Sequence, residues 1–319
     1  MNIVFMGTPE FAIPSLNRLL EEGHQVAAVI TQPDRPKGRG KERKPPPVKE
    51  AALKKGLCVL QPENIREAKW VEQIQSVEPK LIVTVAYGQI LPKDILDIPQ
   101  KGCLNVHASL LPAYRGAAPI HWAIINGERE TGVTIMMMDE GMDTGDMIVQ
   151  EKIPITTKDT VGTLHDKLAD LGADLLIQAI ELIQLDQFAG ISQDHSRATY
   201  APLLKRKHEK IDWTKSAREI VNLIRGMNPW PGAYTIFRQK NLKIYEADVY
   251  TGEGQGIIAR EDPPGTVVRI IKKKGFVVLC GSGYVLVKKV KLENSRAMTA
   301  DDFLRGSRLE EGERLGNDS

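Results

Sequence analysis

The first third of the chain alternates short, uninterrupted apolar runs with a segment of helical character, and this alternation constrains the fold most. Apolar runs at residues 3–6, 26–31 and 81–86 have the length and continuity of strands that are buried on both faces. A helix is expected at residues 14–22, where Pro14 suits the first turn because its missing N–H needs no partner there. The spacing predicts βαβ units, and therefore an α/β fold with a Rossmann-like, doubly wound, mostly parallel sheet.

Two segments that follow these strands would lie at the carboxyl edge of the sheet, where active sites of such folds are found. The first is Gly7-Thr8-Pro9-Glu10, and the second begins at Tyr87. The first segment lacks the G-x-G-x-x-G pattern of dinucleotide sites, and the chain has no GxxxxGK[ST] motif. The sequence therefore argues against both a nicotinamide cofactor and a nucleoside triphosphate.

A possible catalytic cluster comes from two other segments. Residues 103–107 are typical of the end of a strand, and alternation places Asn105 and His107 on one face of it. Asp143 stands in a glycine-flanked acidic loop at residues 141–146. An amide can stabilise an oxyanion, an imidazole can move a proton, and a carboxylate can orient the imidazole, so the three together could perform acyl transfer. Taken singly, such a histidine or aspartate is more often structural, and the prediction depends on their combination.

The basic insertion at residues 32–48 is the most unusual stretch in composition. It carries six cations within ten positions, and its glycines and prolines are expected to exclude regular structure. A long cationic loop at the site edge of the sheet is suited to a phosphate-bearing substrate. The cations are Arg35, Lys37, Arg39, Lys41, Arg43 and Lys44.

The length of 319 residues predicts two domains. We expect a catalytic domain at residues 1–190, a linker at 191–206 and a smaller domain at 207–319. A long amphipathic helix is expected at residues 160–185 near the end of the first domain. Five short apolar runs in the second domain predict a β-barrel of the oligonucleotide-binding (OB-like) type. These runs are at residues 233–237, 242–249, 265–271, 276–280 and 285–290.

The formal net charge of +2 hides an asymmetry between the two ends of the chain. Residues 201–319 hold 22 Lys and Arg against 15 Asp and Glu, whereas residues 1–200 have a net charge of −5. A basic C-terminal part indicates either binding to a polyanion or simply a solvated lysine-rich surface.

The cysteine pattern and the apolar runs bear on compartment and metal content. Cys58, Cys103 and Cys280 are odd in number and far apart, as expected of buried thiols in a reducing cytoplasm. No HExxH or HxH pattern occurs, so no metal is expected. The chain has neither a signal-peptide pattern nor a run near the ~18 apolar residues of a membrane span, and a cytoplasmic protein without a membrane partner is predicted.

Two adjacent motifs carry a family resemblance. Residues 105–119 have the pattern NVHxSLLPxxRGxxP, and residues 139–146 have the pattern DxGxDTGD. Together they resemble the folate-dependent formyltransferase family. The likeness extends over nearly the whole chain, through MGTPEF, TQPDRPKGRG, VAYGQILP, IDW and NPWPGAY. It is greatest to the members that formylate initiator methionyl-tRNA for translation initiation.

The resemblance implies a reaction and a set of site residues. The expected reaction moves the formyl group of 10-formyltetrahydrofolate to the free amino group of methionyl-tRNA, in an enzyme that is a monomer and needs no metal. By resemblance, Asn105, His107 and Asp143 match the catalytic trio, and a basic loop grips the tRNA. The tetrahydrofolate segment would be Ser109, Leu110, Leu111 and Pro112, the pteridine pocket Tyr87, Gly88, Gln89, Ile90 and Leu91, and the tRNA contacts Arg39, Lys41, Arg43 and Lys44.

Two alternatives stay open at this point. A formyltransferase of the same family could act on a small amine, either an amino-sugar nucleotide or glycinamide ribonucleotide. A protein that binds tRNA without catalysis could also retain the fold. The basic insertion and the basic C-terminal part favour tRNA over a small amine, and the intact trio favours an enzyme over a binding protein.

Overall fold

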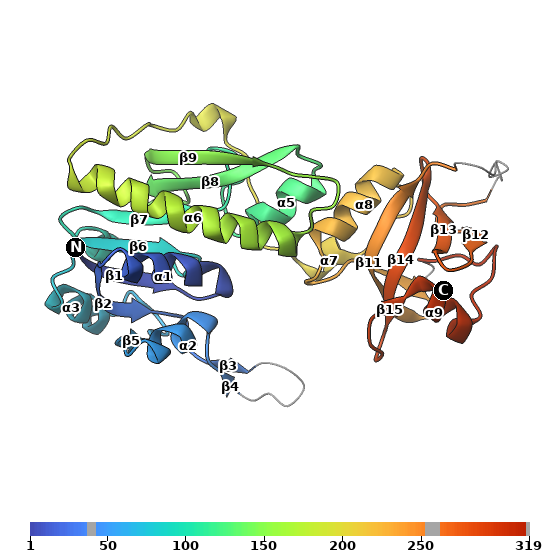
Figure 1. Cartoon of the computed structure of the whole chain (residues 1–319), viewed down its shortest axis with the longest axis horizontal. Coiled ribbons are helices and arrows are strands. Elements are labelled where there is room, and N and C mark those ends of the chain that lie inside the picture. The colour runs from blue at the N-terminus through green and yellow to red at the C-terminus, as the bar shows by residue number, and fades with distance from the viewer. Residues whose placement is uncertain (37–42, 253–261, 317–319) are drawn as a thin grey trace. The chain divides into compact units, whose positions relative to one another are not determined.

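A computed structural model describes residues 1–36, 43–252 and 262–316 of the chain. The chain folds as two compact units, each made from three stretches of sequence (Figure 1). The first unit consists of Met1–Pro119, Glu130–Pro154 and His165–Pro202, and the second of Ile120–Arg129, Ile155–Leu164 and Leu203–Ser319.

A seven-stranded sheet organises the first unit, in the order β5-β2-β1-β6-β7-β8-β9. The first five strands of this order are parallel, whereas β8 runs antiparallel to β7 and β9 antiparallel to β8. The predicted mostly parallel, Rossmann-like sheet is therefore confirmed. The strands are β1 (Asn2–Gly7), β2 (Gln25–Ile30), β5 (Val59–Leu60), β6 (Leu81–Val85), β7 (Cys103–His107), β8 (Glu130–Met137) and β9 (Met147–Pro154).

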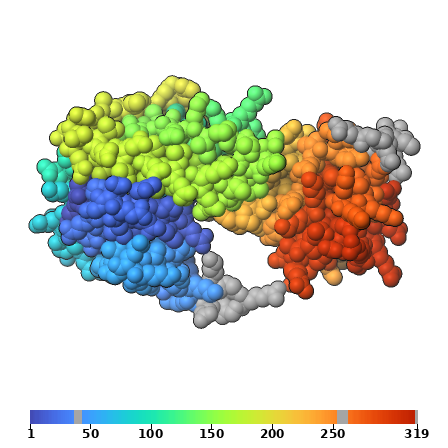
Figure 2. Space-filling view, in the orientation of Figure 1, coloured from blue at the N-terminus to red at the C-terminus, as the bar shows by residue number. Residues whose placement is uncertain are grey.

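Helices cover this sheet, and the longest is α6 (Val161–Gln184), which matches the helix expected at residues 160–185 (Figures 1 and 2). The helix packs so closely on β7 at Gly172 that a Cβ there would lie only 2.8 Å from Val106 Cγ1. The other helical segments are η1 (Glu10–Ala12), α1 (Ile13–Glu21), α2 (Pro47–Lys54), α3 (Ala68–Ser76), α4 (Lys93–Leu96) and η2 (His195–Arg197).

The basic insertion contains regular structure, and our expectation that glycines and prolines exclude it is wrong. β3 (Arg35–Pro36) pairs antiparallel with β4 (Arg43–Lys44), and helix α2 begins at Pro47. Proline lacks an N–H for the ladder, which fits so short a ribbon, but it is well tolerated in a first helical turn. Lys49 Nζ lies 2.8 Å from Asp34 Oδ1 and joins the two ends of the insertion. Lys37, Arg39 and Lys41 fall outside the described residues.

An antiparallel sheet forms the centre of the second unit, in the order β10-β11-β14-β13-β12, with β15 paired to β14. All five strands expected from the sequence are present, so the predicted C-terminal β-domain is confirmed. The strands are β10 (Tyr234–Phe237), β11 (Lys240–Tyr250), β12 (Val267–Ile271), β13 (Gly275–Leu279), β14 (Tyr284–Leu292) and β15 (Met298–Thr299). The helices are α5 (Pro119–Ile125), α7 (Arg206–Glu209), α8 (Ala217–Gly226) and α9 (Ala300–Ser307).

Two segments from the first half of the sequence pack against α8 in the second unit. His121 Nδ1 lies 2.7 Å from the carbonyl oxygen of Gly226, and Arg225 Nε donates to the carbonyl oxygen of Asp159 at 2.8 Å. Ile125 packs against the apolar core of this unit. The second unit is thus assembled from residues far apart in the sequence, and nothing in the sequence pattern indicates this.

Candidate active site

The site begins with β7, which lies between β6 and β8 and presents two polar side chains near its end. Asn105 pairs with Thr84 of β6 and Met136 of β8, and His107 pairs with Thr134 of β8. The alternation of a strand places both side chains on one face. His107 is buried, with 6% of its surface exposed.

Asp143 reaches these two side chains from the loop between β8 and β9. Its Oδ1 accepts a hydrogen bond from Asn105 Nδ2 at 3.4 Å and lies 3.6 Å from His107 Nδ1. Its backbone is left-handed, with φ of 52°, a conformation that aspartate tolerates better than most residues. The structure thus brings together the three side chains that the sequence singled out.

The second nitrogen of His107 also faces an acceptor. Nε2 lies 3.0 Å from the carbonyl oxygen of Tyr114, which can only accept a hydrogen bond. The two ring nitrogens of His107 therefore lie between the Asp143 carboxylate and the Tyr114 carbonyl, next to the Asn105 amide.

Gly116 holds the other oxygen of the carboxylate. Its backbone N–H donates to Asp143 Oδ2 at 2.8 Å. The φ of Gly116 is +116°, and a Cβ there would lie 2.9 Å from the carbonyl oxygen of Ala201. Glycine is required at this position for both reasons. Gly116 lies inside the RGxxP part of the sequence motif, but the sequence analysis gave it no role.

The predicted tetrahydrofolate segment, Ser109 to Pro112, is fixed to the neighbouring strands. The hydroxyl of Thr134 donates to the carbonyl oxygen of Ser109 at 2.7 Å and accepts from the N–H of Leu111 at 3.2 Å. Gln150 donates to the carbonyl oxygen of Leu111 at 3.0 Å. Ser109 and Leu111 are buried, so the segment is a rigid wall beside the cluster. Thr134 and Gln150 were not foreseen, because neither belongs to the motif.

The predicted pteridine segment, Tyr87 to Leu91, mixes buried and exposed side chains. Tyr87 and Leu91 are buried, whereas Ile90 is 62% exposed. Burial raises the pKa of the Tyr87 hydroxyl, which therefore stays protonated. The side chain of Gln89 accepts from the N–H of Ile65 and donates to the carbonyl oxygen of Pro62, and so secures the segment to the residues before α3.

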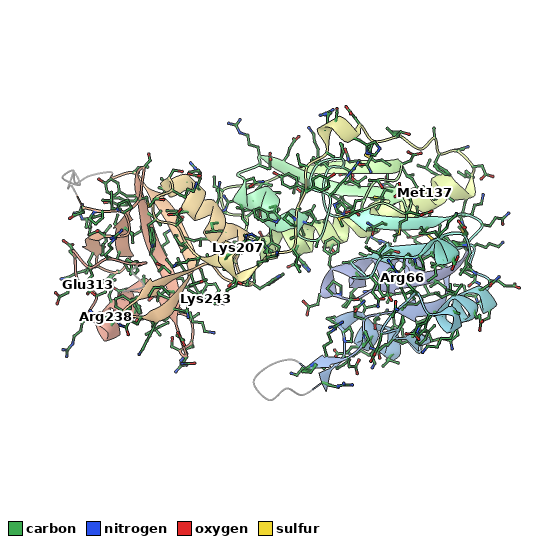
Figure 3. The ribbon with its side chains drawn as sticks, turned by 180° about the vertical axis from the view of Figure 1, so that it is seen from behind. Arg66, Met137, Lys207, Arg238, Lys243 and Glu313 are labelled. Atoms are coloured by element: carbon green, nitrogen blue, oxygen red, sulfur yellow. The ribbon has the colours of Figure 1, made fainter. Side chains whose placement is uncertain are left out.

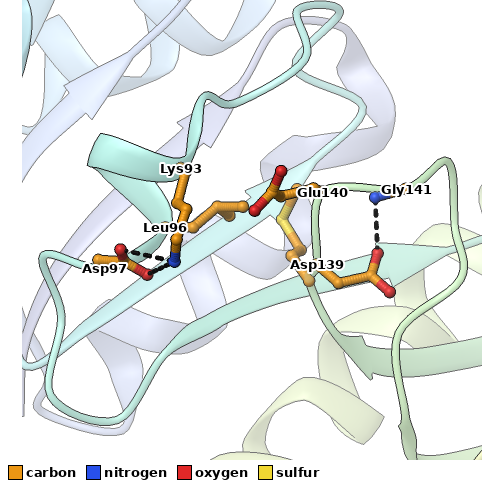
Figure 4. A pocket seen from close by; sticks show the side chains of 7 residues that line it. Lys93, Leu96, Asp97, Asp139, Glu140 and Gly141 are labelled. Carbon is orange, nitrogen blue, oxygen red and sulfur yellow. Dashed lines mark hydrogen bonds and ion pairs between the residues drawn. The ribbon is translucent and has the colours of Figure 1, made fainter.

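A hollow of about 450 Å³ lies between α4 and the start of the Asp143 loop (Figure 4). Leu96 and Met138 give it apolar walls, and Lys93 pairs with Asp97 at its rim. The N–H of Gly141 donates to Asp139 Oδ1 at 3.0 Å, which shapes the loop on the other side. Asp139 and Gly141 belong to the DxGxDTGD pattern, whereas Lys93, Leu96, Asp97 and Met138 were not singled out from the sequence. Their only signal was position, since α4 follows residues 87–91 and residue 138 leads into the loop.

Two more buried polar residues, missed by the sequence analysis, lie behind the Asp143 loop. Arg115 is 3% exposed and Gln193 is 5% exposed. Arg115 belongs to the NVHxSLLPxxRGxxP motif, whereas Gln193 stands in a polar stretch that we expected to be a linker. The two side chains hydrogen-bond to each other, and Gln193 also donates to two backbone carbonyl groups. A sequence motif cannot reveal such contacts.

The predicted tRNA contacts are only partly described. Arg43 and Lys44 form β4 and are exposed, and Arg39 and Lys41 lie outside the described residues. Across residues 1–36, 43–252 and 262–316, no three or more His, Cys, Asp or Glu side chains gather as a metal site would require. Within the same residues, no helix combines the length and the apolar character needed to cross a bilayer.

The sequence matches two family descriptions that together account for both units. Residues 1–180 match Formyl transferase, and residues 203–308 match Formyl transferase, C-terminal domain. The chain therefore belongs to the formyl transferase family.

Individual relatives share one name. Methionyl-tRNA formyltransferase of Desulforamulus reducens is 52% identical over 316 residues, which cover 99% of this chain and 98% of the relative. Methionyl-tRNA formyltransferase of Acetivibrio thermocellus is 50% identical over 316 residues, which cover 99% of this chain and all of the relative. Among solved structures, HypX from Aquifex aeolicus in complex with tetrahydrofolic acid has a TM-score of 0.65 at 17% identity. That match covers 99% of this chain and 50% of HypX, and it supports the fold alone.

Proposed function

We propose that this chain transfers the formyl group of 10-formyltetrahydrofolate to the α-amino group of initiator methionyl-tRNA, giving N-formylmethionyl-tRNA for translation initiation. The family and the names of relatives about half identical over the full length support the reaction and the substrate. The observation that carries the chemistry is the meeting of Asn105, His107 and Asp143 around one carboxylate oxygen.

The nucleophile is the substrate amine, which needs little activation. Free α-amino groups titrate near ~7.7–8.0, so a sizeable fraction is neutral at working pH. Attack on the formyl carbon forms a carbon–nitrogen bond and a tetrahedral oxyanion. The Asn105 amide and the His107 ring are the donors assigned to that oxyanion, the ring by releasing the carbonyl oxygen of Tyr114, and such a donor contributes roughly 3 kcal/mol to the transition state.

Asp143 acts in this scheme through His107. Its carboxylate lies 3.6 Å from His107 Nδ1 and orients the ring. A water held by the same carboxylate would accept the proton that the amine loses. When the tetrahedral adduct collapses, the bond between the formyl carbon and N10 breaks, and N10 of the folate takes up a proton.

We assign the folate to the first unit, beside the cluster. The Ser109–Pro112 wall is hydrogen-bonded to Thr134 and Gln150 of β8 and β9, Ile90 is exposed after β6, and the hollow lies between α4 and residues 138–141 (Figure 4). The hollow has apolar surface from Leu96 and Met138, and Lys93, Asp97, Asp139 and Glu140 give it charged groups that could hydrogen-bond to a flat heterocycle.

We assign tRNA binding to basic residues of both units. Arg43 and Lys44 are the described part of the basic insertion, and Lys207 is an exposed cation at α7 of the second unit (Figure 3). The positive charge of residues 201–319 supports a phosphate-binding role for the predicted domain 207–319, with residues 1–190 as the catalytic domain. We further propose that the enzyme acts as a monomer in the cytoplasm, where its tRNA substrate is found.

The experiment that tests this function measures formyl transfer from 10-formyltetrahydrofolate to methionyl initiator tRNA. Glycinamide ribonucleotide and an amino-sugar nucleotide are offered in parallel. We expect formylated methionyl-tRNA and no product from the small amines. Turnover of a small amine without turnover of tRNA would replace the proposed substrate, and tight tRNA binding without any transfer would indicate a binding protein.

The proposed roles of the trio predict the effect of three substitutions. Asn105→Ala, His107→Ala and Asp143→Ala should each lower kcat by about 10²–10³-fold, because each removes a donor to the oxyanion or its charge partner. The KM values should change little. Steady-state kinetics with both substrates checks this, and His24→Ala, at the amino end of β2, is a matched control. Near-normal turnover in any of the three would remove that residue from the mechanism.

A further inference from the structure

The side chain of Gln193 forms two hydrogen bonds to the backbone of the Asp143 loop. Its Nε2 donates to the carbonyl oxygen of Asp143 at 2.9 Å and to that of Gly145 at 2.8 Å. Both carbonyls belong to the loop, and Gln193 comes from a stretch fifty residues further along the chain. The side chain is buried, so water does not readily replace these two donors.

The other end of the same amide is held by Arg115. Gln193 Oε1 accepts from Arg115 Nη2 at 2.6 Å and from Arg115 Nε at 3.2 Å. Arg115 Nη2 also lies 3.1 Å from His195 Nδ1. The amide orientation is thereby fixed, because a guanidinium can only donate and must face the carbonyl oxygen of the side chain.

These contacts close a ring around the catalytic carboxylate. Arg115 precedes Gly116, whose N–H binds Asp143 Oδ2, while Gln193 binds the carbonyl of Asp143 itself. The side chain of Asp143 is therefore hydrogen-bonded to Gly116, and its backbone to Gln193. Gln193 is in turn hydrogen-bonded to Arg115, the residue before Gly116. The loop needs such support because Asp143 has a positive φ of 52°.

We propose that Gln193 is a positioning residue for formyl transfer, which acts by keeping the Asp143 loop in the place that puts the carboxylate against His107. Arg115 orients Gln193 for this task. The proposal rests on the proposed function, and it adds a residue that touches neither the folate nor the amine in that scheme.

Two substitutions separate the donor role of Gln193 from its bulk. Gln193→Glu keeps the size and the acceptor for Arg115 but replaces the two N–H donors by an oxygen. Gln193→Met keeps the length and removes all polar contacts. Misplacing a reacting group by about 1 Å can cost about 10²-fold, and we expect either variant to lower kcat by about ten- to a hundredfold, with KM values within about twofold.

A double-mutant cycle with Asp143→Asn decides whether Gln193 acts through Asp143. Asparagine also tolerates a positive φ, so the loop backbone is preserved. If the two residues act as one, Gln193→Glu should change the kcat of Asp143→Asn by less than about twofold. Multiplied losses in the double variant would overturn the proposal.

A nearby control and a second readout complete the test. Gln187→Glu, the matched control, makes the same change at an exposed glutamine six residues earlier in the chain. It should leave kcat near normal. Hydrogen exchange of peptides that span residues 139–147 should quicken in both Gln193 variants and not in the control. A normal kcat in the Gln193 variants, with Asp143→Asn slowed by about 10²-fold or more, would sink this inference alone, whereas near-normal turnover of Asp143→Asn would sink the proposed mechanism.

Discussion

The Asp143 carboxylate draws its partners from separate parts of the chain. Asn105 and His107 come from β7, and Gly116 comes from the segment that follows. In the proposed mechanism, each partner would supply a different element of acyl-transfer chemistry: a neutral donor, a proton carrier and a fixed backbone dipole. The side chains were found from sequence because they lie in a dense motif. The backbone N–H of Gly116 was not, since every residue except proline has one.

The three thiols differ in burial: the expectation of buried thiols is wrong for Cys58, and this difference predicts their reactivity. Burial raises the pKa of Cys103 to about 12 and that of Cys280 to about 12, whereas Cys58 is exposed. Because the thiolate is the reactive form, a thiol reagent at pH 8 should modify one cysteine rapidly in the folded chain and all three in denaturant. Absorbance titration with a chromogenic disulfide measures this. More than one fast thiol in the folded chain would contradict the burial.

The raised pKa values of Cys103 and Cys280 determine whether stability rises or falls at high pH. A thiol with a raised pKa in the folded state stays protonated there, while in the unfolded chain the thiol loses its proton near its ordinary pKa of 9.0. The unfolded state therefore binds fewer protons between pH 9 and 12, and stability falls as pH rises through that window. The Cys103 and Cys280 contributions are fully present below pH 9.

Helix α8 begins with a reciprocal cap that the sequence alone can show. The side chain of Ser216 accepts from the N–H of Glu219, and the Glu219 carboxylate accepts from the N–H of Ser216 at 3.0 Å. Ser216→Ala should lower the free energy of unfolding by about 1 kcal/mol. Ser216→Asp, which keeps an acceptor at the cap, serves as control. Equal midpoints in urea for Ser216→Ala and the native chain would argue against the cap.

The pH dependence of this cap follows from its carboxylate. Hydrogen bonds from Ser216 lower the pKa of Glu219 in the folded state. A lowered folded pKa means that the contribution is present above the unfolded value and is lost as pH falls through the folded one. The difference between the native chain and Ser216→Ala should therefore shrink in acid.

Elements with a strong hydrophobic period were predictable, and short or half-exposed elements were not. The expected strands at 3–6, 81–86 and 103–107 appear as β1, β6 and β7 within a residue or two at each end. β5 has only two residues, and β9 is an edge strand with several exposed positions. Neither has enough buried positions to leave a pattern. Gln193 escaped notice for a related reason, because its partners are mainly carbonyl groups.

At the scale of the whole molecule, the second unit depends on segments that precede it by up to a hundred residues. Arg225 of α8 donates to the carbonyl oxygens of Asp159 and Thr156, at 2.8 and 2.7 Å. Burial lowers the pKa of this guanidinium, which nevertheless stays charged. The contacts bind residues 155–164 to α8.

Arg225→Met should therefore destabilise the second unit by about 1–3 kcal/mol, since it leaves two carbonyls without their donor. Equilibrium unfolding measures the loss of stability. Faster hydrogen exchange in peptides covering residues 155–164 would show that the loss arises in that segment. Arg218→Met, an exposed position on the same helix, is the matched control. Unchanged exchange in residues 155–164 would show that these hydrogen bonds contribute little.

The interleaved second unit also imposes an order on biosynthesis. Ile120–Arg129 leaves the ribosome well before its partner α8 exists. At about 5–20 residues per second, the nascent chain carries Ile125 without the α8-containing core against which it packs for roughly 5–20 s. A chaperone that recognises short apolar segments on nascent chains would therefore find its binding site here.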